Sequence, residues 1–311
     1  MSARLSAVDA LVRGFANLRA NWELILAQLL ATFLVMLLGA LSLLPLVFAL
    51  GVELTEIGRD PWDTLARFLD PALWLSGSML TAIGLGLVVG TAALAVYAWF
   101  QGGVFGVLVA GDRQAGEGTG RPWALFRAFS WGDFAGWAGR GLPRFFVWYN
   151  LYLLISTLLV ALYGLLAIAA LRFGMARGPA AGVGLGCAGL LPLVALSWLC
   201  SLWVTAAKAD LARDGSGALE SWTRSARVVS ARLGAAALLF LLFFAASAAM
   251  GMLLFPLQMA SELGARGHFG AYLGAQLFVT LLQWLLGSFL GLVYGASYVA
   301  LVRGELPDAA G

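Results

Sequence analysis

The sequence has very few charged residues. Only 11% of its 311 residues are Asp, Glu, Lys or Arg, whereas an average soluble domain has about 25%. With 61% hydrophobic residues as well, the chain cannot cover a water-facing surface, which excludes an ordinary soluble domain. The sequence therefore predicts a protein that lies in a lipid bilayer.

Residues that bind metals or catalyse reactions are also scarce. His268 is the only histidine and has no neighbouring cysteine, so we expect no metal centre. Cys187 and Cys200 fall in one predicted helix about 20 Å apart, beyond disulfide reach, and are interpreted as packing residues. The sequence has no P-loop and no G-x-S-x-G elbow. We therefore expect no enzyme, no cofactor and no nucleic-acid partner.

Six long windows contain no charged residue. A membrane-spanning helix needs about 20 apolar residues, and one charge at the bilayer centre costs about 3 kcal/mol. Every window exceeds this length; they cover residues 24–52, 71–111, 145–171, 178–207, 233–261 and 269–302. The sequence thus predicts an all-α polytopic membrane protein with six transmembrane helices. Because no ionisable residue lies deep in a window, ion-coupled pumping is disfavoured.

The arginines predict the orientation of these helices. The N-terminal segment and the second and fourth loops are rich in arginine, whereas the first loop is acidic and the third and fifth are short. Since basic residues accumulate on the cytoplasmic side, we expect both termini in the cytoplasm. Residues 1–20 have no uninterrupted apolar core, so no cleavable signal peptide is expected. The near absence of lysine indicates a bacterial source, and hence a bacterial cytoplasmic (inner) membrane.

Three cytoplasmic segments have apolar residues at helical spacing, with basic residues between them. They precede the first, third and fifth windows and predict interfacial elbow helices, the second with a break at Gly132. Their apolar residues are Leu5, Val8, Val12, Phe15, Leu18 and Trp22 in the first; Trp123, Phe126, Phe129, Phe134 and Trp137 in the second; and Leu219, Trp222, Ala226, Val229 and Leu233 in the third.

These segments indicate an internal repeat within one membrane domain spanning residues 1–311. The sequence Leu-Leu-Pro-Leu at 43–46 in the first window has a counterpart, Leu-Phe-Pro-Leu, at 254–257 in the fifth. We predict three parallel repeats, residues 1–113, 121–214 and 217–303, each an elbow helix followed by a transmembrane hairpin. The alternative is a helical array that looks repetitive only because arginine recurs in its cytoplasmic loops. Asp60-Pro61-Trp62 also predicts a short helix on the outer leaflet, or alternatively a lid over a pore.

Small and amide side chains indicate how the helices pack. Glycines four residues apart allow close approach of helices, within the chain or in a homo-oligomer. Such pairs include Gly86, Gly90, Gly102, Gly106, Gly287, Gly291 and Gly295. Gln276 and Gln283 are seven residues apart on one helical face, where they either bond across helices or line a polar cavity.

The elbow segments resemble one known family. The resemblance is carried by residues 13–24, by Gly102-Gly103-Val104 to Gly111-Asp112-Arg113 with Leu125-Phe126-Arg127-Ala128-Phe129, and by residues 218–232. The chain resembles, over nearly its whole length, the six-helix membrane domain attached to some bacterial glycerophosphoryl diester phosphodiesterases and its stand-alone relatives. The resemblance implies a fold and no activity, because the family's hydrolysis belongs to a separate soluble barrel.

Two functions are therefore considered. The first is a non-catalytic membrane scaffold or accessory domain whose basic elbows bind anionic lipids or a protein partner. Its candidate residues are Arg13, Arg19, Arg127, Arg140, Arg224, Arg227 and Arg232. The alternative is that these arginines only determine the membrane topology. The second is a permease or channel component for a small neutral or amphiphilic solute, with Gln276 and Gln283 beside its path.

Overall fold

The computed structural model describes residues 5–55, 70–116, 121–214, 217–264 and 269–303. Within these ranges the chain forms helices and no strand, so the predicted all-α class is confirmed. The elements are α1 (Ala7–Ala20), α2 (Glu23–Thr55), α4 (Pro71–Trp74), α5 (Gly77–Gln114), the 3-10 helix η1 (Trp123–Phe126), α6 (Trp131–Arg177), α7 (Pro179–Asp214), α8 (Ala218–Ala231), α9 (Leu233–Gly264) and α10 (Phe269–Val302).

Six of the helices in the described chain are long and apolar enough to cross a membrane, namely α2, α5, α6, α7, α9 and α10. Each contains most or all of one predicted window. Two of them extend beyond their windows towards the elbow segments: α6 already begins at Trp131, and α7 continues to Asp214. Pro192 does not end α7, which runs through it.

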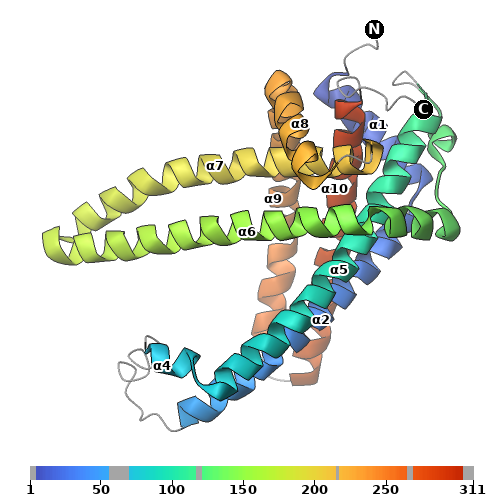
Figure 1. Cartoon of the computed structure of the whole chain (residues 1–311). Coiled ribbons are helices and arrows are strands. Elements are labelled where there is room, and N and C mark those ends of the chain that lie inside the picture. The colour runs from blue at the N-terminus through green and yellow to red at the C-terminus, as the bar shows by residue number, and fades with distance from the viewer. Residues whose placement is uncertain (1–4, 56–69, 117–120, 215–216, 265–268, 304–311) are drawn as a thin grey trace.

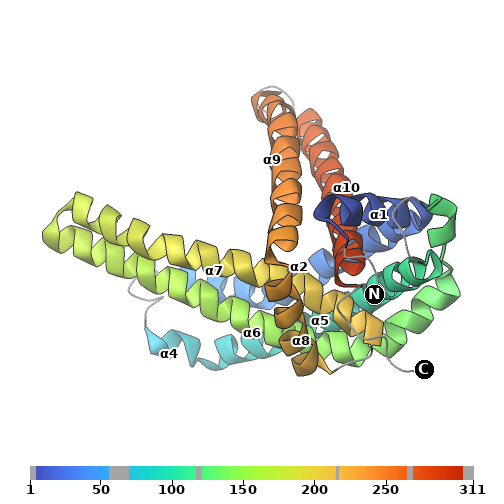
Figure 2. The ribbon, with the colours of Figure 1, turned by 90° about the horizontal axis from the view of Figure 1, so that it is seen from above.

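The six long helices pack as three hairpins that meet at one end. The pairs are α2 with α5, α6 with α7, and α9 with α10, and they point in different directions from the common end (Figures 1 and 2). Buried apolar side chains such as Leu108, Ala206 and Tyr298 gather where the pairs meet. Along the diverging parts large apolar side chains are exposed, for example Leu87 at 67% and Leu253 at 76%. Such a surface is consistent with a multi-pass membrane protein.

The amphipathic segments differ in structure. The first and third form the separate helices α1 and α8, whereas the second contains η1 and the start of α6. The predicted break at Gly132 is wrong. The interruption comes earlier, because the Ser130 hydroxyl accepts a hydrogen bond from the Asp133 amide at 3.1 Å and caps α6 just before Trp131.

The three amphipathic segments each pack on the last helix of a hairpin. α1 packs on α10, the start of α6 on α5, and α8 on α7. The α1 contact is so close that a Cβ atom at Gly14 would lie 2.5 Å from the Ser297 backbone nitrogen. At the α8 contact the Trp203 indole donates a hydrogen bond to the Trp222 carbonyl at 2.7 Å. The helices α5, α7 and α10 also contact one another, which closes a ring.

The glycines of the predicted packing pairs have different surroundings. A Cβ atom at Gly86 would lie 2.7 Å from the Ser42 carbonyl oxygen of α2, and one at Gly106 would lie 2.5 Å from Trp137 of α6. Gly102 and Gly295 also face neighbours, Gly141 and Phe105. Gly90, Gly287 and Gly291 have no such atom within 4 Å, so no close helix approach within the described chain requires them.

One predicted helix and the histidine lie outside the described residues. The predicted outer helix at Asp60-Pro61-Trp62 falls in residues 56–69, and His268 falls in residues 265–268.

Candidate functional site

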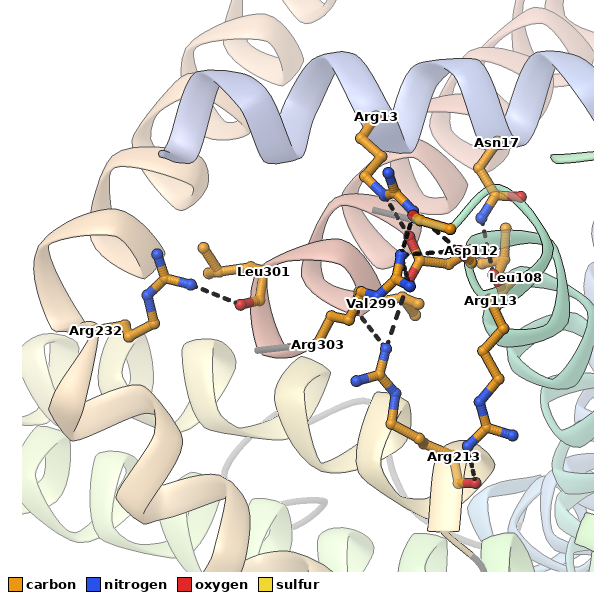
Figure 3. Close-up of polar contacts among 11 residues, drawn as sticks. Arg13, Asn17, Leu108, Asp112, Arg113, Arg213, Arg232, Val299, Leu301 and Arg303 are labelled. Carbon is orange, nitrogen blue, oxygen red and sulfur yellow. Dashed lines mark hydrogen bonds and ion pairs between the residues drawn. The ribbon is translucent and has the colours of Figure 1, made fainter. Parts of the chain in front are cut away.

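The helices α5, α7 and α10 end together around the buried carboxylate of Asp112. Asp112 is 1% exposed, and its Oδ1 accepts a hydrogen bond from Arg13 Nε at 2.6 Å. Its Oδ2 lies 3.4 Å from Arg213 Nη2 and 3.7 Å from Arg303 Nη1. Figure 3 shows these side chains converging from α1, α5, α7 and the end of α10. We call Asp112 with Arg13, Arg113, Arg213 and Arg303 the hub.

The arginines of the hub also bind the carbonyl groups at the three helix ends. Arg113 donates to the Arg213 carbonyl at 2.8 Å, and Arg213 to the Val299 carbonyl at 3.5 Å. Arg303 in turn donates to the Asp112 carbonyl at 3.1 Å. Each helix end therefore supplies the arginine that binds the end of the next helix, from α5 to α7 to α10 and back. Since the carboxyl end of a helix carries partial negative charge and unpaired carbonyls, a guanidinium there stabilises it.

Polar side chains of α1 donate hydrogen bonds to the carbonyls at the end of α5. Arg13 donates to the carbonyls of Asp112 at 2.9 Å and Gly116 at 2.7 Å, and Asn17 donates to the Leu108 carbonyl at 2.8 Å. Asn21 donates to the Phe126 carbonyl at 2.7 Å, and its Oδ1 accepts from two backbone amides, those of Ala128 and Phe129, at 2.8 Å each. These bonds fix the elbow of the second hairpin against α1.

Four of the seven candidate arginines make hydrogen bonds or ion pairs with other elements of the fold. Arg13 belongs to the hub, and Arg232 of the α8–α9 turn donates to the carbonyls of Leu301, at 2.8 Å, and Leu5. Arg127 binds the Glu23 carboxylate at 2.5 Å and 2.6 Å, and these hydrogen bonds raise the pKa of Arg127. Arg224 binds Glu220 at 2.5 Å and lies 3.6 Å from the buried Asp210. These four are therefore held by the fold.

The other three candidate arginines are exposed, one on each amphipathic segment. They are Arg19 on α1, Arg140 on α6 and Arg227 on α8. The guanidinium of Arg19 lies 5.1 Å from the Trp123 ring centre, and that of Arg140 lies 4.4 Å from the Trp137 ring centre. Both distances are within the range of cation–π contacts.

A polar cavity of about 450 Å³ lies among α2, α5, α7 and α10, on the hairpin side of the hub. It therefore touches all three hairpins. Its polar lining within the described chain comprises Gln28, Thr32, Tyr97, Gln101, Thr205, Lys208, Gln283, Ser288 and Tyr294. Gly287, Gly291 and Gly295 form part of its wall, whereas Gln276 does not line it.

Lys208 provides the positive charge of the cavity. Among the described lining residues it is the only charged one. Its ammonium nitrogen lies 5.7 Å from the Trp148 ring centre and 5.3 Å from that of Tyr149. Part of the amide lining is already bonded, because Gln101 Nε2 donates to Gln28 Oε1 at 2.9 Å. In the part of the chain that the structure describes, no hydrogen bond or ion pair is found for Lys208, Gln283 or Ser288.

The sequence reasoning anticipated only part of these two sites. Lining a cavity was one of the two roles predicted for Gln283, but Lys208 and Asp112 fall just outside the predicted windows 178–207 and 71–111. Because α7 continues to Asp214, Lys208 lies inside a long helix. A signal was nevertheless available, since Lys208 is the only lysine of the chain. The burial of Asp112 had no such signal, because it depends on how three separate helix ends meet.

Comparison of the chain with protein families, with curated proteins and with solved structures finds no match. The described residues also contain no group of three or more His, Cys, Asp or Glu side chains that could hold a metal ion.

Proposed function

We propose that this chain is a non-catalytic membrane protein that binds anionic lipids through its amphipathic segments. The observation that carries the proposal is the inverted placement of α1. Its buried face includes the polar residues Arg13 and Asn17, whereas the apolar side chains of Val8 and Val12, which are 56% and 54% exposed, are turned away from the protein. In water this arrangement would be unfavourable; at a lipid interface the apolar face is buried in the bilayer.

The other two amphipathic segments support the same proposal. Trp131 is 57% exposed at the start of α6, and Leu219 of α8 is 71% exposed. Each segment also carries one of the exposed arginines Arg19, Arg140 and Arg227. A basic residue close to an anionic membrane surface contributes about 1 kcal/mol of binding free energy. Three such residues beside apolar side chains would favour anionic over neutral lipids.

This proposal includes an orientation in the membrane. The six long helices cross the bilayer, and the hub and both termini lie on the cytoplasmic side of a bacterial inner membrane. Support comes from the concentration of arginine at the hub end and from the positive-inside rule. The proposal also retains the likeness to the membrane domain of glycerophosphoryl diester phosphodiesterases as a relationship of fold.

We further propose that the three hairpins are repeats around a pseudo-threefold axis. The support is that the contacts between the hairpins close a ring. Each amphipathic segment packs on the last helix of the preceding hairpin, including α1 on α10, and each of Arg113, Arg213 and Arg303 binds the next helix end. A helical array with scattered arginines has no reason to close such a ring.

Lipid copurification tests the lipid-binding proposal. The triple variant Arg19→Gln, Arg140→Gln and Arg227→Gln should retain less phosphatidylglycerol than the unaltered protein when both are purified in the same mild detergent. The matched control is Arg172→Gln with Arg177→Gln, which removes two exposed arginines from the far end of the α6–α7 hairpin. Equal lipid retention in the triple variant and the unaltered protein would refute the proposal.

The cavity favours a second function, a permease or channel component for a small neutral or amphiphilic solute. It touches all three hairpins, and each hairpin contributes polar side chains to its lining. The hub lies at its end towards the helix termini, so passage through the protein would require the Asp112 ion pairs to separate. Solute uptake into proteoliposomes, faster for Asp112→Asn than for the unaltered protein, would favour this function over the lipid-binding scaffold.

A further inference from the structure

The cavity has a charge that the fold does not neutralise. Lys208 lines it, and the described lining residues include no Asp or Glu. Its ammonium group lies over the ring faces of Trp148 and Tyr149. Cation–π contacts contribute about 0.5–2 kcal/mol and leave the three N–H donors of an ammonium without acceptors. An anion entering the cavity would supply acceptors for these N–H donors.

Neutral donors accompany this charge. Gln283 and Ser288 lie on α10 and line the same cavity as Lys208 of α7. Their side chains have no hydrogen bond within the described chain, so an amide N–H and a hydroxyl remain for a ligand. An ammonium together with an amide and a hydroxyl suits an oxyanion such as phosphate, which accepts several hydrogen bonds at once.

The position of Lys208 in α7 is close to the depth of lipid head groups. Lys208 precedes the last residue of α7, Asp214, by six positions, which is about 9 Å at 1.5 Å per residue. The head-group layer on each side of a bilayer is about 5–8 Å thick. Tilt of α7 would bring Lys208 closer still to that layer.

An apolar groove adjoins the cavity. It has a volume of about 290 Å³ and shares Gly287, Gly291 and Tyr294 with the cavity. Its other walls include Phe243 and Phe244, and Phe244 is 62% exposed. The groove therefore leads from the polar cavity to the apolar surface of the α9–α10 hairpin, and its glycines leave space for a chain to pass.

We infer that the cavity binds the phosphodiester group of an anionic phospholipid at Lys208, Gln283 and Ser288, with an acyl chain in the adjoining groove. This inference rests on the proposed function, lipid binding, but it concerns a different site. The exposed arginines bind lipid at the surface in exchange with the bulk bilayer, whereas the cavity holds a single lipid molecule between the hairpins.

Thermal unfolding of the purified full chain in detergent tests this inference, with increasing amounts of three additives. These are phosphatidylglycerol, phosphatidylcholine and sodium phosphate. Phosphatidylglycerol should raise the Tm with a saturable dependence, and Lys208→Gln should weaken its apparent affinity about ten- to hundredfold, the usual loss for one buried hydrogen bond to a charged group. Lys208→Arg keeps the charge and should retain the effect.

Two variants of uncharged lining residues keep the test decisive if Lys208→Gln fails to fold. Gln283→Leu and Ser288→Ala should each weaken the phosphatidylglycerol effect severalfold. Arg172→Gln, at the far end of the α6–α7 hairpin, is the matched control and should change nothing. Undiminished stabilisation of Lys208→Gln, or of both Gln283→Leu and Ser288→Ala where Lys208→Gln does not fold, would overturn the inference.

The additives distinguish the source of the anion, and the arginine variants distinguish the two lipid proposals. A Lys208-dependent shift with sodium phosphate alone, and none with lipid, would overturn the phospholipid as ligand and assign the site to a soluble anion. The triple variant of Arg19, Arg140 and Arg227 should keep the Lys208-dependent shift while retaining less lipid. Loss of that shift in the triple variant would show that surface binding explains both effects, and would overturn a separate site.

Discussion

Asp112 is the residue on which the meeting of the three hairpins depends most. Three guanidinium groups lie around its carboxylate, and both Asp112 and Arg13 are 1% exposed. Asp112→Ala would leave these cations close together without their shared anion, a change that costs about 3–5 kcal/mol for a buried ion pair. We expect a large fall in Tm in detergent. Asp133→Asn, which changes an exposed carboxylate beside Ser130, is the control and should alter the Tm by a small fraction of that amount.

At the scale of single residues, the sequence predicts a side of the membrane for each arginine but not what the arginine binds. Arg13 and Arg19 lie on the same short helix, yet Arg13 is buried at the hub and Arg19 is exposed. The apolar stripe of α1, including Val8 and Val12, was visible in the sequence. That Val8 and Val12 face away from the protein while Leu18 is buried depends on where α10 lies, which no local pattern records.

At the scale of the elements, the contact of α1 with α10 requires a glycine. A Cβ atom at Gly14 would lie 2.5 Å from the Ser297 backbone nitrogen, and backbone atoms cannot move aside as a flexible side chain can. Gly14→Ala should therefore destabilise the protein by about 1–3 kcal/mol through overpacking. Gly39→Ala in α2 is the matched control, since no atom lies within 4 Å of a Cβ there, and alanine should stabilise that helix by up to about 1 kcal/mol. Equal unfolding temperatures for the two variants would contradict this account of the contact.

The boundaries of the elements were predictable where charge and capping coincide. The N-terminal boundary of α9 at Leu233 agrees with the predicted window and directly follows Arg232, which caps the end of α8. The start of α6 was predicted poorly, because the apolar window considers hydrophobicity alone and α6 extends beyond it through Arg140 and Arg144. Gly132 suggested a break, but it lies in the first turn of a helix that Ser130 already caps, where glycine is tolerated.

At the scale of the whole molecule, six apolar helices could be predicted because each must satisfy its own backbone hydrogen bonds in lipid. The direction in which each hairpin leaves the hub could not be predicted in the same way. It follows from the packing of α1 on α10, of the start of α6 on α5 and of α8 on α7. It also depends on long-range bonds such as that of Arg13 with Asp112, which lie 99 positions apart. The cavity exists only as a result of that arrangement.

The proposed orientation predicts which positions are accessible from outside the cell. In a background in which Cys187 and Cys200 are replaced by alanine, single cysteines at Ser76 and Arg177 should react with a membrane-impermeant maleimide in intact cells. Both residues lie at hairpin ends far from the hub, before α5 and at the end of α6. Cysteines at Ser6 and Gly217, beside the amphipathic helices α1 and α8, should react only after the membrane is permeabilised. Labelling of position 6 together with position 177 in intact cells would place the hub and a hairpin end on the same side, and neither the six crossings nor the binding of inner-leaflet lipids by Arg19, Arg140 and Arg227 would then hold.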